Sequence, residues 1–262
     1  MKALVFAAGL GSRLKPWTDS HPKALAPVGG IPMLGRVIKK LTDAGITDIV
    51  VNVHHFAGQI ADYLNTTDFN ARITLSDESS LLLDTGGGLL KAAHLLADSG
   101  QILVHNADIF TDFDISEMSR FAAGSQAMAC LLAKERETQR YLAFDSSGKM
   151  HGWTNIATGQ VRPAANADII SRCNLRAFGG VHIVDESIFK ALAEYNASLL
   201  EKTPDRDTSD GICKFSITDF YIDNCEKYLF KAFEPSSPYR WIDIGKAENL
   251  LQADTMVGAT EE

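Results

Sequence analysis

The chain has 262 residues, of which 45% are hydrophobic and 22% are charged, and its formal net charge is −8. This composition is typical of a folded globular protein and excludes a largely disordered chain. The negative charge argues against nucleic acid or an anionic membrane as the main partner, and no segment approaches the roughly 20 apolar residues that cross a bilayer. The first apolar run is too short for a secretory signal, and the four cysteines form no Cys-x-x-Cys pair. We therefore expect a cytoplasmic protein with free thiols, either a monomer or a small homo-oligomer.

The first strand and the loop after it carry the strongest signal. Residues 3–8 are continuously apolar, which predicts a short strand buried on both faces of a parallel sheet. Gly9 and Gly11 then allow the backbone to approach a ligand closely, and Arg13 and Lys23 add positive charge at two separate points. A polyphosphate needs exposed backbone N–H groups and fixed cations, so this stretch predicts a nucleoside triphosphate site.

Two common glycine-loop motifs are excluded here. The dinucleotide fingerprint requires a third glycine where Leu14 stands, and a Walker loop requires Gly-Lys-Ser/Thr where this sequence has Gly11-Ser12-Arg13. The plain structural alternative is a tight strand-to-loop turn without a ligand, because a lone Gly-x-Gly is weak evidence.

Strands and helices alternate after this loop. The apolar spacing predicts a helix over 33–44, a strand over 48–53, a helix over 56–64 and a strand over 72–75. Such alternation is typical of βαβ units in a mostly parallel sheet. Asn52 lies near the end of the second strand, where its side-chain amide can read a base edge through a paired donor and acceptor.

A run of three glycines at 86–88 leads into a helical pattern over 89–96. Backbone N–H groups at such a helix start can face an anion or a planar base. The alternative is a loop that needs unusual dihedral angles.

Asp108 follows a buried strand predicted over 101–105. A carboxylate just past the carboxyl end of a strand is well placed for a hydrated Mg²⁺, although this acidic stretch also suits a solvated loop. Asp114 is expected to cap the helix predicted over 115–122.

The second half of the chain gives weaker signals. Gly180 interrupts an apolar strand, and glycine within a strand often marks the close approach of a ligand. Asp243, taken alone, suits an N-cap or a turn. The remaining predicted elements are a strand at 127–133, a β-hairpin formed by 141–144 and 149–153, a mobile polar loop at 155–174, a strand at 177–184, a helix at 186–194, a loop at 202–211, and helices at 217–225 and 247–253.

Taken together, these motifs resemble the signature of the sugar-1-phosphate nucleotidyltransferases. The resemblance is carried by Gly9-x-Gly11-x-Arg13-x-x-Pro16-x-Thr18-x-x-x-Pro22-Lys23-x-Leu25, by the aspartate of Asn106-Ala-Asp108, and by Trp241-Ile-Asp243-Ile-Gly245. It implies an α/β fold with a Rossmann-like, mixed and mostly parallel central sheet flanked by helices, together with a small β-hairpin subdomain that binds the sugar. Ala107 departs from the family, which has glycine at that position.

The resemblance also implies roles for particular residues. Lys23 and Arg13 are the candidate catalytic residues, and Asp108 and Asp243 are the candidate ligands of Mg²⁺, the expected cofactor. Thr154-Asn155 stands where the family usually has Glu-Lys-Pro, so no sugar-binding carboxylate is carried over. The candidate nucleotide contacts are Ala8, Gly9, Gly11, Ser12, Arg13, Lys23, Asn52, Asp84, Thr85 and Gly86, and the candidate sugar-phosphate contacts are Gly180 and Asn155.

The resemblance covers nearly the whole chain. It implies one nucleotidyltransferase domain over 1–258, with an NTP-binding half at 1–125, a sugar-phosphate-binding half at 126–258 and a tail at 259–262. The partners it implies are an NTP and a sugar 1-phosphate.

Asp84-Thr-Gly-Gly-Gly most resembles family members that transfer uridylyl groups to N-acetylmuramate 1-phosphate. GTP-dependent transfer to a mannose or heptose 1-phosphate is the close alternative, and cytidylyl transfer to choline phosphate is a third. From other classes, a non-catalytic regulator that binds nucleotide sugars and a metal-dependent glycosyltransferase stay open.

Overall fold

The computed structural model describes residues 1–258, and the predicted tail at 259–262 lies outside these residues. Its centre is a ten-stranded mixed sheet in the order β11-β10-β9-β12-β6-β1-β4-β5, with β8 paired to β12 and β15 paired to β8. The strands of this sheet are β1 (Lys2–Phe6), β4 (Asp48–Val53), β5 (Arg72–Asp77), β6 (Gln101–Asn106), β8 (Ala129–Lys134), β9 (Arg140–Phe144), β10 (Met150–Asn155), β11 (Gln160–Arg162), β12 (Asn174–Asp185) and β15 (Phe230–Phe233).

Four parallel strands, β5, β4, β1 and β6, form the first half of the sheet. The apolar run that predicted β1 divides its side chains between two cores, because successive residues of a strand point to opposite faces. Ala3 and Val5 enter one core, and Leu4 enters the other. The prediction of a strand buried on both faces is therefore confirmed.

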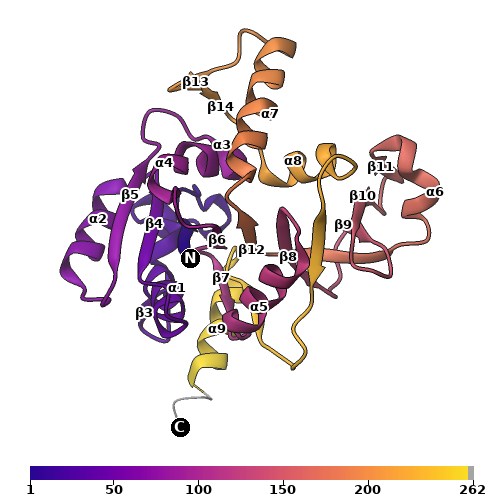
Figure 1. Cartoon of the computed structure of the whole chain (residues 1–262). Helices are drawn as coiled ribbons and strands as arrows, with labels where there is room; N and C mark the ends of the chain where they lie inside the picture. The colour runs from indigo at the N-terminus through magenta and orange to yellow at the C-terminus, as the bar shows by residue number, and fades with distance from the viewer. Residues whose placement is uncertain (259–262) are drawn as a thin grey trace.

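Helices cover both faces of the sheet (Figure 1). Helices α1, α2, α5 and α9 contribute to the core that contains Val5, whereas α3, α4, α7 and α8 contribute to the core that contains Leu4. The helices are α1 (Met33–Asp43), α2 (Ala57–Thr66), α3 (Asp84–Lys91), α4 (Ala93–Leu96), α5 (Ile115–Ser125), α6 (Ala167–Ile170), α7 (Ile188–Lys202), α8 (Ile217–Asn224) and α9 (Ala247–Gly258).

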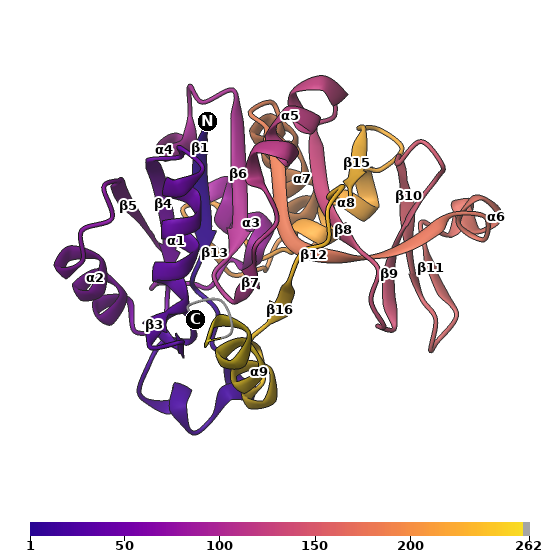
Figure 2. The ribbon, with the colours of Figure 1, turned by 90° about the horizontal axis from the view of Figure 1, so that it is seen from below.

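Strand β12 belongs to two parts of the molecule. Its carboxyl-terminal half pairs antiparallel with β6 and β8, whereas Asn174–Arg176 at its other end pair with β9. The register shifts between Phe178 and His182, and Gly180 adopts φ 73°, a conformation that favours glycine. The strand bends here and leads away to β9, β10, β11 and α6 (Figure 2). This small antiparallel unit contains the β-hairpin that the sequence predicts.

The expectation of a mobile polar loop at 155–174 is wrong. This stretch forms β11 and α6, and β11 extends the hairpin through the pairing of Trp153 with Arg162. Arg162 is also held by ion pairs to Asp219 and Asp223 at 2.8 and 2.9 Å. Strand pairing and the ion pairs of Arg162 therefore give this segment its structure. The sequence does not indicate this, because the segment contains few large apolar side chains. The loop expected at 202–211 likewise contains a short strand, β13 (Thr208–Ser209), which pairs with β14 (Ile212–Cys213).

Within residues 1–258, no helix combines the length and the hydropathy needed to cross a membrane. The division into an NTP-binding half and a sugar-phosphate-binding half stays a prediction.

Asp114 caps α5, as the sequence predicts, by accepting a hydrogen bond from the backbone N–H of Ser116 at 2.8 Å. This bond holds the pKa of the Asp114 carboxyl below its usual range. Asp114→Ala should lower the free energy of unfolding by about 0.5–2 kcal/mol, because an N–H of the first helical turn loses its partner. Urea denaturation at pH 7 measures the change.

Asp114→Asn is the matched control, because an asparagine oxygen still accepts the bond, and its stability should stay near that of the wild type. The difference between wild type and Asp114→Ala should shrink as the pH falls through the depressed pKa of Asp114. Equal stability of the two variants at pH 7 would contradict the cap assignment.

Candidate active site

A pocket of about 300 Å³ lies at the carboxyl ends of the parallel strands. Ligands of open α/β sheets are usually bound at this edge. The lining residues are Phe6, Ala7, Ala8, Gly9, Lys23, Ala24, Asn52, Glu78, Leu82, Asp84, Thr85, Asn106, Ala107, Asp108 and Lys214. Seven of the residues that the sequence singles out, Ala8, Gly9, Lys23, Asn52, Asp84, Thr85 and Asp108, therefore share one cavity.

Asn52 fixes the start of the glycine loop. Its Oδ1 accepts hydrogen bonds from the backbone N–H groups of Ala7 at 2.7 Å and Ala8 at 3.3 Å, and its side chain is buried. Its Nδ2 donates to Glu78 Oε1 at 2.8 Å. Both ends of the amide are thus engaged within the protein, so Asn52 positions the start of the loop, and because it also lines the pocket its contact with a nucleotide stays a prediction.

Glu78 is a site residue that the sequence reasoning missed. It is fully buried, and its two carboxylate oxygens accept hydrogen bonds from Asn52 Nδ2 and from the backbone N–H of Leu83. Burial raises the pKa of Glu78, and these two bonds oppose the rise. Gly88 makes room for it, since a Cβ there would lie 2.6 Å from Glu78 Oε1. The available signal was its position directly after β5, the same kind of position that singled out Asp108.

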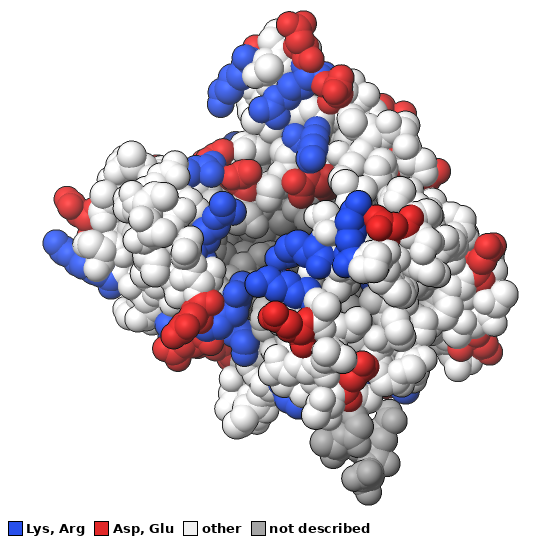
Figure 3. Space-filling model, turned by 180° about the vertical axis from the view of Figure 1, so that it is seen from behind, with Lys and Arg blue, Asp and Glu red and all other residues white. Residues whose placement is uncertain are grey.

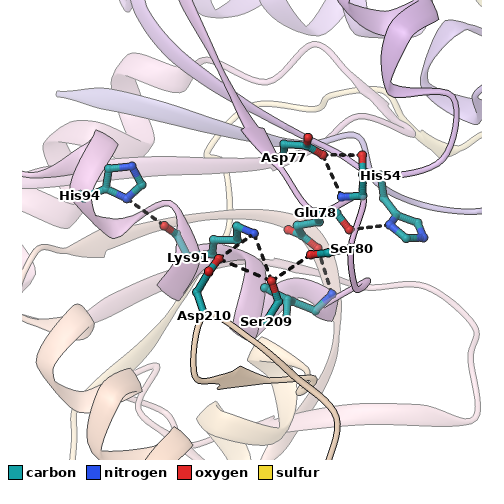
Figure 4. Close-up of polar contacts among 10 residues, drawn as sticks. His54, Asp77, Glu78, Ser80, Lys91, His94, Ser209 and Asp210 are labelled. Atoms are coloured by element: carbon teal, nitrogen blue, oxygen red, sulfur yellow. Dashed lines mark hydrogen bonds and ion pairs between the residues drawn. The ribbon is translucent and has the colours of Figure 1, made fainter.

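Ser80 and helix α3, both of which follow Glu78 in the chain, contact the hairpin formed by β13 and β14 (Figure 4). Ser80 Oγ lies 3.0 Å from Ser209 Oγ, and Lys91 forms an ion pair with Asp210 at 3.2 Å. These contacts join Ser80 and helix α3 to the β13–β14 hairpin.

Gly11 has two reasons to be glycine. Its φ is 64°, in the left-handed region, and a Cβ there would lie 2.8 Å from Lys23 Cβ and 2.9 Å from Thr18 Cγ2. The loop therefore closes tightly over Lys23. Ser12 and Arg13 follow in an exposed 3₁₀ turn, Ser12–Leu14.

Arg13 reaches the late segment around Asp243. A Cβ at Gly245 would lie 2.9 Å from Arg13 Nη2 and 2.8 Å from Asp243 Oδ1, so the guanidinium and this carboxylate both lie next to the same glycine. Among residues 1–258, Arg13 forms no ion pair within 4 Å, which leaves its charge available to a ligand.

Two short strands bring the aspartates together. Strand β7 (Ile109–Thr111) pairs antiparallel with β16 (Trp241–Asp243), with Asp243 opposite Ile109. The backbone N–H of Ile244 donates to the carbonyl of Asp108 at 2.9 Å. Lys23, which is only 8% exposed, bonds to Asp108 Oδ2 and lies 4.0 Å from Asp243 Oδ1. Both carboxylates are thus within reach of one ammonium group.

The glycine run at 86–88 serves packing. Helix α3 begins at Asp84 and so includes the glycines, whereas the sequence analysis placed them before the helix. The N–H groups of Gly86 and Gly87 donate to the carbonyl of Phe215 at 2.9 and 3.2 Å. A Cβ at Gly86 would lie 2.4 Å from the Phe215 ring. Gly86 does not line the pocket, and the N–H groups that were expected to face a ligand bind the chain itself.

The two predicted sugar-phosphate residues lie in different settings. Gly180 lies at the bend of β12, where a Cβ would come within 3.0 Å of Asn106 Nδ2, beside the loop that carries Asp108. Asn155 closes the turn between β10 and β11, with Oδ1 accepting from the N–H of Ala157 at 3.0 Å.

Opposite charges meet at this edge of the molecule. The surface is hollowed here, and Lys and Arg side chains gather around the hollow (Figure 3). In a protein of net charge −8, this local excess of positive charge favours an anionic ligand. Within residues 1–258, no group of three or more His, Cys, Asp or Glu side chains is placed to hold a metal. The metal-binding role of Asp108 and Asp243 stays a prediction.

Comparison with known proteins shows the family to which the chain belongs. Residues 2–259 match the family model described as Nucleotidyl transferase. The N-acetylmuramate alpha-1-phosphate uridylyltransferase of Neisseria meningitidis serogroup B is 41% identical over 195 residues, which span 73% of this chain and 78% of that protein. The mannose-1-phosphate guanyltransferase of Schizosaccharomyces pombe is 32% identical over 146 residues, spanning 54% of this chain and 40% of that protein.

The fold has counterparts among solved structures. A putative glucose-1-phosphate thymidylyltransferase from Bacillus anthracis matches with a TM-score of 0.75 and 20% identity, over 98% of this chain and 94% of that one. The mixed α/β fold implied by the sequence resemblance is thereby confirmed. The family model spans nearly the whole sequence, and the chain belongs to the nucleotidyl transferase family.

Proposed function

We propose that the protein transfers a uridylyl group from UTP to N-acetylmuramate α-1-phosphate and releases pyrophosphate. The observation that carries this proposal is the convergence of Lys23, Asp108 and Asp243 beside the glycine loop. The choice of substrate follows the uridylyltransferase of Neisseria meningitidis, which is 41% identical over 73% of this chain.

The reaction suits a site without a general base. An oxygen of the sugar phosphate attacks the α-phosphorus of UTP in line, and pyrophosphate leaves. The attacking phosphate is already anionic at neutral pH, so no proton has to be removed from it. The obstacle is repulsion between two anions, which positioned charges relieve.

The basic residues divide this task. Lys23 lies between the aspartates and the glycine loop, where its ammonium neutralises charge on the α-phosphate or on the incoming phosphate. Arg13 extends from the same loop with no carboxylate partner within 4 Å in residues 1–258, and it steadies the departing pyrophosphate. The backbone at Ala8 and Gly9 lines the pocket next to these groups.

The aspartates fit a magnesium ion. Mg²⁺ binds oxygen ligands and usually takes one or two carboxylates, with phosphate oxygens and water completing its shell. Asp108 and Asp243 would hold it, and one ammonium reaches both carboxylates. When bound, the ion would supply additional neutralisation of phosphate charge.

The activity is tested by measuring pyrophosphate release with each of the four NTPs against a panel of sugar 1-phosphates. UTP with N-acetylmuramate 1-phosphate should give the highest kcat/KM. EDTA should abolish turnover, and excess Mg²⁺ should restore it. A preference for GTP with mannose 1-phosphate would support the guanylyltransferase alternative, which the Schizosaccharomyces pombe relative favours. Binding of nucleotide sugar without any turnover would support a regulator instead.

Removing a carboxylate from the centre should stop the chemistry without unfolding the protein. Asp108→Asn is expected to lower kcat on the order of 100-fold or more, because it removes the negative charge of a candidate metal ligand that also forms an ion pair with Lys23. Lys23→Ala should have an effect of at least similar size. Asp114→Asn, at the nearby cap of α5, is the matched control and should keep wild-type kinetics. Full activity of Asp108→Asn with Mg²⁺ would refute the assignment.

Removing the Asn52 side chain, which holds the glycine loop, should weaken nucleotide binding and lower the stability of the fold. Asn52→Ala removes the side-chain acceptor of the Ala7 and Ala8 N–H groups and one of the two donors to the Glu78 carboxylate. An unsatisfied buried group costs about 1–3 kcal/mol, so the melting temperature should fall and KM for UTP should rise. Calorimetry and steady-state kinetics measure the two effects, and an unchanged KM would separate Asn52 from the nucleotide site.

A further inference from the structure

A second group of basic residues lies over the aromatic rings of Tyr239 and Trp241, the latter two residues before Asp243. Lys134 Nζ lies 4.8 Å from the ring centroid of Tyr239 and 5.7 Å from that of Trp241, and Arg136 Cζ lies 5.1 Å from Trp241. The indole N–H of Trp241 donates to the carbonyl of Gly179 at 2.8 Å, which fixes the ring beneath both cations. The two charges are therefore held in place by aromatic faces.

The topology places these cations at the rim of the reaction centre. Lys134 is the last residue of β8, and β8 and β6 both run antiparallel to β12, so they end at the same edge of the sheet. Trp241 and Asp243 are two residues apart on β16 and lie on one face of it, because Ile242 between them is buried on the other. The cation-bearing ring and the candidate metal ligand thus share a short strand.

Neither cation has a carboxylate partner in the described part of the chain. Glu135 and Glu137 flank Arg136 in sequence, but no ion pair within 4 Å joins them to it or to Lys134 in residues 1–258. Arg176, on the neighbouring strand β12, is by contrast paired with Glu234 at 3.0 Å. Burial and the charge of Arg136 lower the pKa of Lys134. Lys134 and Arg136 are two positive charges beside the Trp241 ring. A bound anion would reduce the repulsion between them and accept charge-assisted hydrogen bonds from both.

We propose that Lys134 and Arg136 bind a carboxylate that the acceptor sugar carries in addition to its 1-phosphate. This inference rests on the proposed function, since it assigns the specificity of the same site. The phosphates of both substrates are already served by Arg13, Lys23 and the aspartate pair. A further pair of cations beside Trp241, on the same short strand as Asp243, is therefore available to a further anionic group, and a guanidinium fork matches a carboxylate in a bidentate manner.

N-acetylmuramate 1-phosphate carries such a group. It differs from N-acetylglucosamine 1-phosphate by a lactyl ether that ends in a carboxylate. An unmodified hexose 1-phosphate has no second anion and gains nothing from the two cations. The same residues would thus select for a sugar 1-phosphate that carries a carboxylate over one that does not.

The test compares three acceptors: N-acetylmuramate 1-phosphate, its carboxamide, and N-acetylglucosamine 1-phosphate. Arg136→Met and Lys134→Met remove the charge but keep an unbranched side chain over the rings. Charge-assisted hydrogen bonds are strong, so each variant should lose about 10- to 100-fold in kcat/KM with N-acetylmuramate 1-phosphate and less than about 3-fold with the two acceptors that lack the carboxylate. KM for UTP should not change. Arg136→Lys should recover part of the loss, because it keeps the charge.

The matched controls are Arg172→Met and Lys190→Met, which remove exposed charges elsewhere on the surface. Both should behave as the wild type with all three acceptors, and thermal unfolding checks that each variant is folded. Equal losses with all three acceptors would overturn the inference, because the cations would then serve the shared phosphate or the fold. Unchanged kinetics with every acceptor would also overturn it. If the wild type uses none of the three acceptors, the proposed function itself fails, and this outcome is distinct from the other two.

Discussion

The pairing of β7 with β16 is the constraint on which the site depends. It places Asp243 opposite Ile109 and therefore next to Asp108, although a long stretch of chain separates the two aspartates. Two carboxylates repel each other when no cation lies between them, and Lys23 relieves that repulsion from the glycine loop. Because Lys23 is largely buried, its charge is screened less by solvent than that of a surface lysine.

A second set of contacts holds the glycine loop itself. The N–H groups of Ala7 and Ala8 bind Asn52, Asn52 binds Glu78, and Glu78 binds the N–H of Leu83. This network crosses three adjacent strands, β1, β4 and β5, at their carboxyl ends. Buried polar networks of this kind are rigid when every member has a partner. The loop is thus positioned before any ligand arrives, so binding does not have to order it.

The sequence predicts the parallel strands well because their apolar runs have a single physical explanation, burial on both faces. The prediction fails where strand pairing, ion pairs or close packing, rather than the burial of apolar runs, determine the structure. Residues 155–174 contain few large apolar side chains, and strand pairing together with the ion pairs of Arg162 gives them structure. The glycines at 86–88 suggest a ligand loop, but they leave room for the Phe215 ring and for Glu78.

Some site residues can likewise be predicted from a local sequence pattern, whereas others cannot. Gly9, Gly11 and Lys23 form a local pattern that the sequence displays directly. Asp243 carries little information by itself, because an isolated aspartate before a helix usually serves as a cap, and only the resemblance to a family singled it out. Glu78 was missed because a carboxylate after a strand resembles a solvated turn, and its burial depends on Gly88 from a different element.

The late position of β16 in the chain has a consequence for biosynthesis. A ribosome makes the glycine loop, the Asn52–Glu78 network and Asp108 long before it reaches Trp241–Asp243. An emerging chain can assemble the four parallel strands early, yet it lacks the second carboxylate until almost all of the fold is present. Both candidate metal ligands are therefore present only after β16 has been made, and a polypeptide stalled before β16 contains all ten strands of the central sheet but lacks Asp243.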